Sequence, residues 1–174
     1  MKIVNTFVED LYAAKYENEL LHELDRLFTA WLDPGFLLDF FTEHEKDLAW
    51  FGVDPEAAVV ITQVLVEELE DLFLEMSAAL GSLRPEYFFR PLHDSEFIER
   101  QLSSVKGRMR WLRIYGLRID RNLYVISGGA IKLTKTMKER THTQRELEKL
   151  KLCQLFMKEE GIHDEDSFVE FLKD

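Results

Sequence analysis

Residues 108–135 read RMRWLRIYGLRIDRNLYVISGGAIKLTK, and this stretch decides the fold class. Apolar and basic side chains alternate through its first half, with the period of two that is typical of a half-buried strand. Asp120, Arg121 and Asn122 then supply turn chemistry before a second, more apolar run. The stretch therefore predicts a basic antiparallel hairpin.

Two adjacent glycines, Gly128 and Gly129, interrupt the second strand of this hairpin. Paired glycines weaken a regular strand and permit backbone angles that other residues avoid. We therefore expect a bulge or a change of direction at this point, followed by a further strand over Ala130–Leu133.

Upstream of the hairpin, the sequence predicts one or two short strands and then helices. Lys2–Phe7 and Leu11–Tyr16 are rich in residues that favour sheets, and the second run is the better candidate. From Asn18 to Trp31 the apolar spacing becomes that of a helix lying on a core. These elements predict a sheet that helices cover.

Two Asp-Pro pairs predict helix starts, because Asp caps a helix and Pro fits its first position. The pair at 33–34 begins one helix, and the pair at 54–55 begins a long one that is expected to run through Leu80 and end at Gly81. The acidic side chains of the long helix are interpreted as its solvated face, not as paired catalytic carboxylates. They are Glu67, Glu68, Glu70, Asp71 and Glu75.

The segment between the long helix and the hairpin is predicted to hold a packed connector and a helix. The connector covers residues 84–92, and the helix, capped by Asp94, covers Ser95 to about Val105.

After the hairpin, the sequence predicts two more helices. Thr143 and Glu146 have capping-box spacing and predict the start of a helix that ends at Gly161. Asp164 opens a last short helix. Its inward-facing side chains are expected to be Phe168, Phe171 and Leu172.

Together these elements predict a single α+β domain over residues 1–174. A small antiparallel sheet, made of an amino-terminal strand and the hairpin, packs with several helices. The 174 residues, of which 46% are hydrophobic, supply one sizeable core and too little material for two comfortable domains.

Three features predict a cytoplasmic protein with no membrane partner. The longest apolar stretch, Ala57–Val66, is far shorter than the roughly 20 residues that a bilayer span requires. The early acidic residues of the chain do not fit a signal peptide. Cys153 is the single cysteine, which suits a reducing compartment and allows no intramolecular disulfide and no thiolate-based metal cluster.

The formal net charge is −11, but the charges are unevenly distributed. Residues 1–98 carry a net −15, residues 99–151 a net +9 and residues 152–174 a net −5. The basic block can meet a polyanion or pair with its own acidic flanks. Composition alone favours pairing, because a negative overall field opposes steering of a nucleic acid.

Several kinds of site are disfavoured by spacing. The five histidines share no i, i+4 pair, so no metal site is predicted, and His22 and His44 are expected on the solvated surface. No Gly-rich phosphate loop is present, and Ser127 lacks the G-x-S-x-G frame of a nucleophile elbow. No cofactor is predicted.

The hairpin and its exit carry the strongest pattern in the chain. An arginine strand, a tight turn, an apolar strand and the Lys-x-Thr-Lys exit at 132–135 follow one another. This order resembles the sheet core of the RelE/HigB-like (phage Gp49-like) toxin superfamily, over about residues 108–137. The resemblance implies a RelE-like core with helical additions and a ribosome-dependent mRNA endoribonuclease that an antitoxin protein holds inactive.

The resemblance also implies roles for individual residues. Arg113 matches the strand arginine of the family, and Lys132 and Lys135 lie near its lysine-rich exit, so these three are the predicted catalytic residues. Arginine and lysine can neutralise the charge that develops on a scissile phosphate. The predicted substrate-binding residues are Tyr115, Arg118, Tyr124 and His142. The tyrosines could stack on a base or assist proton movement, and His142 has a suitable unperturbed pKa for acid–base work.

The alternative is a non-catalytic interaction module with the same scaffold. Its basic hairpin would be covered by the acidic helices of residues 1–98 or by an acidic partner. The toxin hypothesis predicts an open positive patch, and the module hypothesis predicts a covered one. The sequence leaves open whether the protein is an enzyme and what its oligomeric state is.

Overall fold

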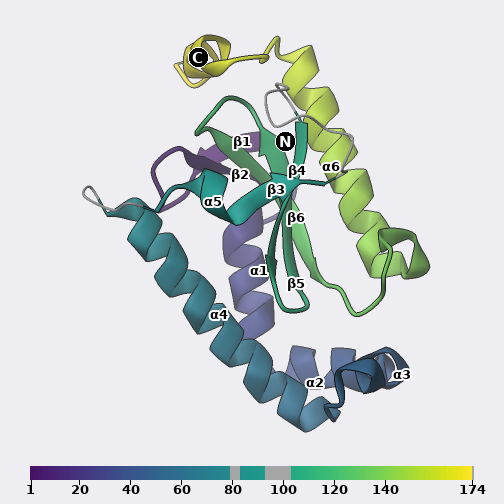
Figure 1. Cartoon of the computed structure of the whole chain (residues 1–174). Helices are drawn as coiled ribbons and strands as arrows, with labels where there is room; N and C mark the ends of the chain where they lie inside the picture. Colours follow the sequence, from purple (N-terminus) through teal and green to yellow (C-terminus); the bar gives the residue numbers. More distant parts are fainter. Residues whose placement is uncertain (79–82, 93–102, 174) are drawn as a thin grey trace.

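The computed structural model describes residues 1–78, 83–92 and 103–173, and one open six-stranded sheet runs through it with helices on both sides (Figure 1). The strand order is β1-β2-β6-β5-β4-β3. The predicted α+β class is confirmed. The strands are β1 (Lys2–Asn5), β2 (Leu11–Lys15), β3 (Phe89–Pro91), β4 (Ser103–Met109), β5 (Leu112–Arg118) and β6 (Tyr124–Ile131).

Neighbouring strands are antiparallel except for β2 and β6, which are parallel and pair Leu11 with Tyr124. Both amino-terminal runs are therefore strands, and they join the sheet beside the last one. Every residue of β6 is buried, as its nearly continuous run of apolar and small residues requires.

The predicted bulge lies in β6, one residue before the glycine pair. Tyr115 of β5 pairs with Gly128 and Gly116 pairs with Ile126, which leaves Ser127 as the extra residue. The Tyr16 hydroxyl donates to the Ser127 carbonyl (2.8 Å), so the bulge is tied to β2. The separate strand expected over Ala130–Leu133 is wrong, because β6 continues unbroken to Ile131.

The helices flank the sheet on two sides, with α4 and α6 on opposite faces (Figure 1). The Asp33 and Asp54 carboxylates cap α2 and α4 as predicted, accepting from Phe36 N (2.7 Å) and Ala57 N (2.8 Å). The long helix ends at Ser77, three residues short of its predicted end at Leu80, because Ala78 is already extended; Gly81 lies outside the described residues. The helices are α1 (Glu23–Leu32), α2 (Pro34–Glu43), α3 (Glu45–Leu48), α4 (Pro55–Ser77), α5 (Pro85–Phe88), α6 (Thr141–Glu159) and α7 (Glu165–Phe171), with 3-10 turns η1 (Ala49–Phe51) and η2 (Met137–Glu139).

The segment before the hairpin differs from its prediction. Residues 84–92 form α5 and strand β3 rather than a connector. The helix expected from Ser95 to Val105 is wrong over its last three residues, which belong to β4; Asp94 and residues 95–102 lie outside the described residues. A strand forms because Val105 and its neighbours pair with β5 along its whole length.

The start of α6 is also displaced. The helix begins at Thr141, and the capping box belongs to Thr136 and Glu139 of η2 instead of Thr143 and Glu146. The Thr143 hydroxyl is turned back to two carbonyls, and the Glu146 carboxylate accepts from Gly129 N (2.9 Å). The Thr143 side chain therefore bonds to the segment just before α6, and the Glu146 side chain makes a tertiary contact with β6.

The carboxyl-terminal helices end and begin where expected. Gly161 takes a left-handed φ of 73° just after α6, and Asp164 caps α7. Phe168 is buried and Phe171 is half-buried, but Leu172 is exposed, contrary to its prediction.

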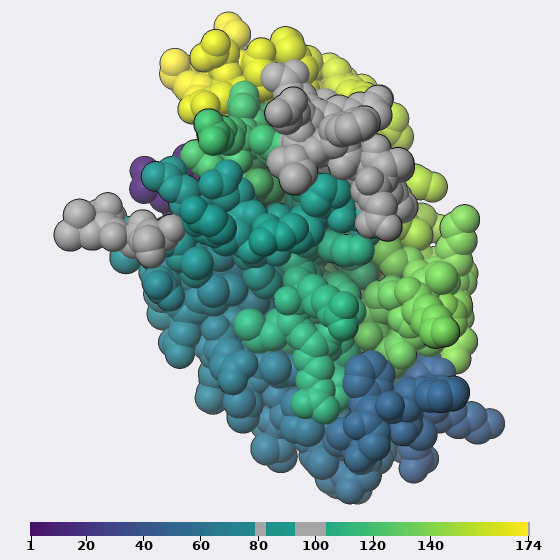
Figure 2. Space-filling view, viewed as in Figure 1, coloured from purple at the N-terminus to yellow at the C-terminus, as the bar shows by residue number. Residues whose placement is uncertain are grey.

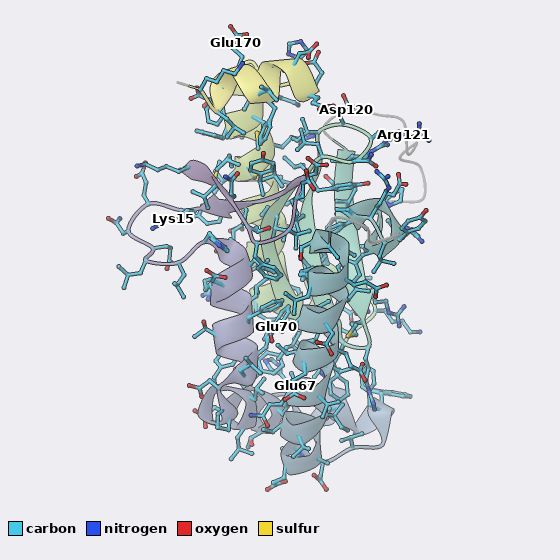
Figure 3. The ribbon with its side chains drawn as sticks, turned by 90° about the vertical axis from the view of Figure 1, so that its left-hand side faces the viewer. Lys15, Glu67, Glu70, Asp120, Arg121 and Glu170 are labelled. Atoms are coloured by element: carbon cyan, nitrogen blue, oxygen red, sulfur yellow. The ribbon has the colours of Figure 1, made fainter. Side chains whose placement is uncertain are left out.

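The sheet separates two apolar layers. Helices α1, α2 and α4 cover one face, where the Trp111 indole donates to Thr62 Oγ1 (3.0 Å). Helices α6 and α7 cover the other, where burial raises the pKa of the Cys153 thiol to about 12. Glu67 and Glu70 lie on the exposed side of α4, as predicted for its solvated face (Figure 3). In the described part of the chain, no helix is long and apolar enough to cross a membrane.

Candidate functional site

Strands β4 and β5 present a row of basic side chains on the face that α6 covers in part. Arg108 pairs with Arg113, and Lys106 pairs with Tyr115. Residues directly opposite one another in an antiparallel pair point to the same face of the sheet. The pairing therefore gathers three cations and one tyrosine on one surface.

The chain that leaves β6 adds a second wall. The Lys132 ammonium donates to the Thr134 carbonyl (2.8 Å) and to the Lys135 carbonyl, so it fixes a tight loop. The η2 turn follows, held by its capping box of Thr136 and Glu139. This wall carries Lys132 and Lys135 beside the hairpin.

The two walls border two hollows of about 610 Å³ each, which share four cationic side chains. The first hollow extends toward α3 and η1, and the second toward the start of α6. In the space-filling view, the β4–β5 hairpin descends at the centre, and the α3 region and the segment before α6 both lie on its right (Figure 2). We call the two hollows the basic groove. Its four shared cations are Arg108, Arg113, Lys132 and Lys135.

The cations of the basic groove lack acidic partners. Within residues 1–78, 83–92 and 103–173, none of the four shared cations forms an ion pair. Lys106 and Lys138 also line the second hollow, where no described lining residue is acidic. The first hollow also has two acidic lining residues, Asp47 and Glu139, whose carboxylates bond to Arg140 and to Thr136 N. The described side chains therefore offset the positive charge of the groove only in part.

Burial and the closeness of other cations lower the pKa values of two groove residues, Arg113 and Lys132. Burial, and then the neighbouring Arg108, lowers the pKa of the Arg113 guanidinium to about 10. Burial, and then Arg113 and Lys106, lowers the pKa of the Lys132 ammonium. The Arg113 Nη1 donates to the carbonyls of Arg110 (2.5 Å) and Leu112 (2.9 Å), which holds the side chain against the hairpin turn. Arg113 is thus a fixed cation that lacks an anion.

The acidic flanks of the chain pair elsewhere. Arg140 forms a bidentate pair with Asp47 (2.6 and 2.7 Å), and Lys149 bonds both oxygens of Glu23 (3.1 and 3.0 Å). The basic block of residues 99–151 is therefore neutralised at its margins. The groove cations are left out of these pairs.

Tyr115 forms part of the floor of the second hollow. Its side chain is 1% exposed, and its hydroxyl has no hydrogen-bond partner among the described residues. Burial raises the pKa of this phenol, so the hydroxyl remains a donor at neutral pH. A buried donor without a partner costs about 1–3 kcal/mol, which an oxygen of a bound ligand would recover.

Three of the predicted substrate-binding residues lie outside the groove. Arg118 and Tyr124 line a separate hollow of about 110 Å³ with Glu86. The His142 Nε2 lies 2.8 Å from the Ile131 carbonyl, and its ring packs against Phe40. Burial lowers the pKa of His142, which favours the neutral ring.

The two histidines expected on the surface are both largely buried. His22 caps α1 by accepting from Asp25 N (3.4 Å), and its side chain is 16% exposed. His44 is 15% exposed and lies beside the His142 ring, with 5.0 Å between ring centroids. In the described ranges, no group of three or more His, Cys, Asp or Glu side chains could hold a metal ion.

The structure brings together Arg113, Lys132, Lys135 and Tyr115, and it adds residues that the sequence analysis missed. Lys106 and Arg108 of β4 and Trp50 of η1 also line the groove. No family model, curated protein or solved structure matches the chain. A function must therefore be argued from the geometry of the groove.

Proposed function

We propose that the protein is a RelE/HigB-like toxin that binds mRNA on the ribosome in the basic groove and cleaves it. The single observation that supports this is the set of four unpaired cations held on one sheet and its exit loop. Phosphate oxygens are the anions that arginine and lysine clusters bind most readily in nucleic acids.

The proposed chemistry uses the RNA's own 2′-hydroxyl. The hydroxyl gives its proton to a water molecule as its oxygen attacks the adjacent phosphorus. A cyclic phosphate forms, and the 5′-oxygen of the next nucleotide leaves with a proton from Lys132. Arg113 and Lys135 stabilise the charge on the phosphorane. The lowered pKa of Lys132 makes its ammonium a better proton donor to the leaving oxygen.

The same proposal includes the predicted partners. An antitoxin with an acidic segment would occupy the groove and block access of RNA, and the site of action would be the cytoplasm. The alternative, a module whose patch is covered by its own acidic helices, receives less support. Asp47 lines the first hollow, but its carboxylate pairs with Arg140 and not with a shared groove cation, and Glu23 pairs with Lys149.

The test is induction of the protein in a bacterial host, with mRNA cleavage on ribosomes measured alongside growth. Wild type should arrest growth, and the double variant Arg113→Ala/Lys132→Ala should not. The matched control is Lys2→Ala/Arg121→Ala, which removes the same charge at two exposed positions that line neither hollow of the basic groove. Arg121 lies in the turn next to α7 (Figure 3).

Circular dichroism must show that all three proteins fold. Equal growth with wild type and the groove variant, and intact mRNA in both, would count against the nuclease. Loss of arrest in the control variant would show that total charge, rather than the groove, is responsible.

A further inference from the structure

Trp50 is a tryptophan with almost no packing contacts of its own. Its side chain is 90% exposed, whereas Trp31 and Trp111 are 2% and 0% exposed. An indole left in water forgoes a large part of the stabilisation that its burial would give. Trp50 lines the first hollow of the basic groove. The stability of the fold does not explain why an exposed indole lies there.

The backbone that carries Trp50 is well anchored. Phe51, the next residue, packs edge-on against the Trp111 ring, with 5.4 Å between centroids. Leu48 is completely buried, and Gly52 closes η1 with a left-handed φ of 66° and a bond to the Ala49 carbonyl. The indole thus projects from a turn that Leu48 anchors in the core and that Phe51 holds against Trp111.

The surroundings of Trp50 combine cations with an aromatic surface. Arg108, Arg110 and Arg113 line the same hollow. Arg110 already lies over the Trp111 ring at 4.5 Å. Proteins that bind single-stranded nucleic acids use this combination, in which cations hold the backbone and an aromatic ring stacks on a base.

We propose that Trp50 stacks on an unpaired base next to the phosphate held by Arg113, so that the groove selects single-stranded RNA. This inference rests on the proposed function and names its substrate class. In a duplex the base faces are covered by their neighbours, and an A-form helix offers chiefly phosphates and 2′-hydroxyls. An exposed indole therefore adds affinity for a single strand and little for a duplex.

The experiment compares a labelled single-stranded RNA of about ten nucleotides with the same strand annealed to its complement. Fluorescence anisotropy gives the affinity, and intrinsic tryptophan emission reports stacking, because Trp50 is the exposed one of the three indoles. Trp50→Ala should weaken single-strand binding by roughly 5-fold to 150-fold and abolish the quenching. Trp50→Phe should recover much of the affinity.

The control variant is Tyr87→Ala, which removes an aromatic ring that is 55% exposed and lines neither hollow of the basic groove. It should bind as wild type does. Equal binding of single strand and duplex, or a Trp50→Ala variant as tight as wild type, would overturn the stacking proposal while RNA binding by the groove stands. If the wild type binds neither RNA, the proposed function and this inference fail together.

Discussion

Replacing Arg113 by Ala should change the salt dependence of RNA binding by an amount that follows from the groove. Four shared cations line it, and no described ion pair holds any of them, so we assign one phosphate to each. Each neutralised phosphate of a single strand contributes about −0.7 to the slope of log affinity against log salt. The wild-type slope should therefore be about −2.8.

The magnitudes are measurable. A slope of about −2.8 means that affinity falls about 50-fold between about 50 and about 200 mM salt. Arg113→Ala should give a slope of about −2.1 and a fall of about 20-fold over the same range. Arg113 carries its full charge in this assay, because its lowered pKa of about 10 remains well above neutral pH.

The assay is a titration of labelled single-stranded RNA, followed by fluorescence anisotropy at several concentrations of potassium chloride. Arg121→Ala is the control, since it removes one exposed charge outside the groove and should leave the slope unchanged. A wild-type slope shallower than about −1 would refute the assignment of four phosphate contacts. Equal slopes for wild type and Arg113→Ala would refute the role of that residue.

Two further predictions concern the contact between β6 and α6. Gly128→Ala should lower the free energy of unfolding by about 1–3 kcal/mol. The new Cβ would lie 2.0 Å from Glu146 Oε2 and would displace this oxygen from Gly129 N. An unchanged midpoint of chemical denaturation would contradict this prediction. Burial raises the pKa of Glu146 to about 6, above the 4.5 of the free side chain. The stabilisation that the protonated Glu146 carboxyl gives to the folded state is therefore fully present below about pH 4.5, and it is lost as the pH rises through about 6. The thermal midpoint of wild type should therefore rise relative to that of Glu146→Gln as pH falls from about 7 to about 5, and parallel pH profiles would exclude this role of Glu146.

The hairpin could be predicted because its period of two and its turn residues are local signals. Strand β4 could not, since Ser, Lys and Gly are poor strand formers and the segment is held by pairing with β5. The start of α6 was displaced for a similar reason. Glu146 meets Gly129 across the fold, and this contact is not encoded in the local spacing of a capping box.

The site shows the same division between local and tertiary information. Five positions separate Arg113 from Arg118 on β5, and an odd separation places two side chains on opposite faces of a regular strand. The spacing alone could thus have predicted that Arg113 and Arg118 line different hollows. The approach of Trp50 to the groove could not, because it depends on how α3 and η1 pack against the hairpin.

The parallel pairing of β2 with β6 affects when the sheet can be completed during synthesis. The hydroxyl of Tyr16 bonds to Ser127, a partner 111 positions later in the chain. A nascent chain therefore carries β1 and β2 without their neighbour until β6 has left the exit tunnel. Such long loop closures slow folding. The strands that carry the groove also follow β1 and β2 in the chain, so the growing chain acquires its cationic surface only after these strands have been made.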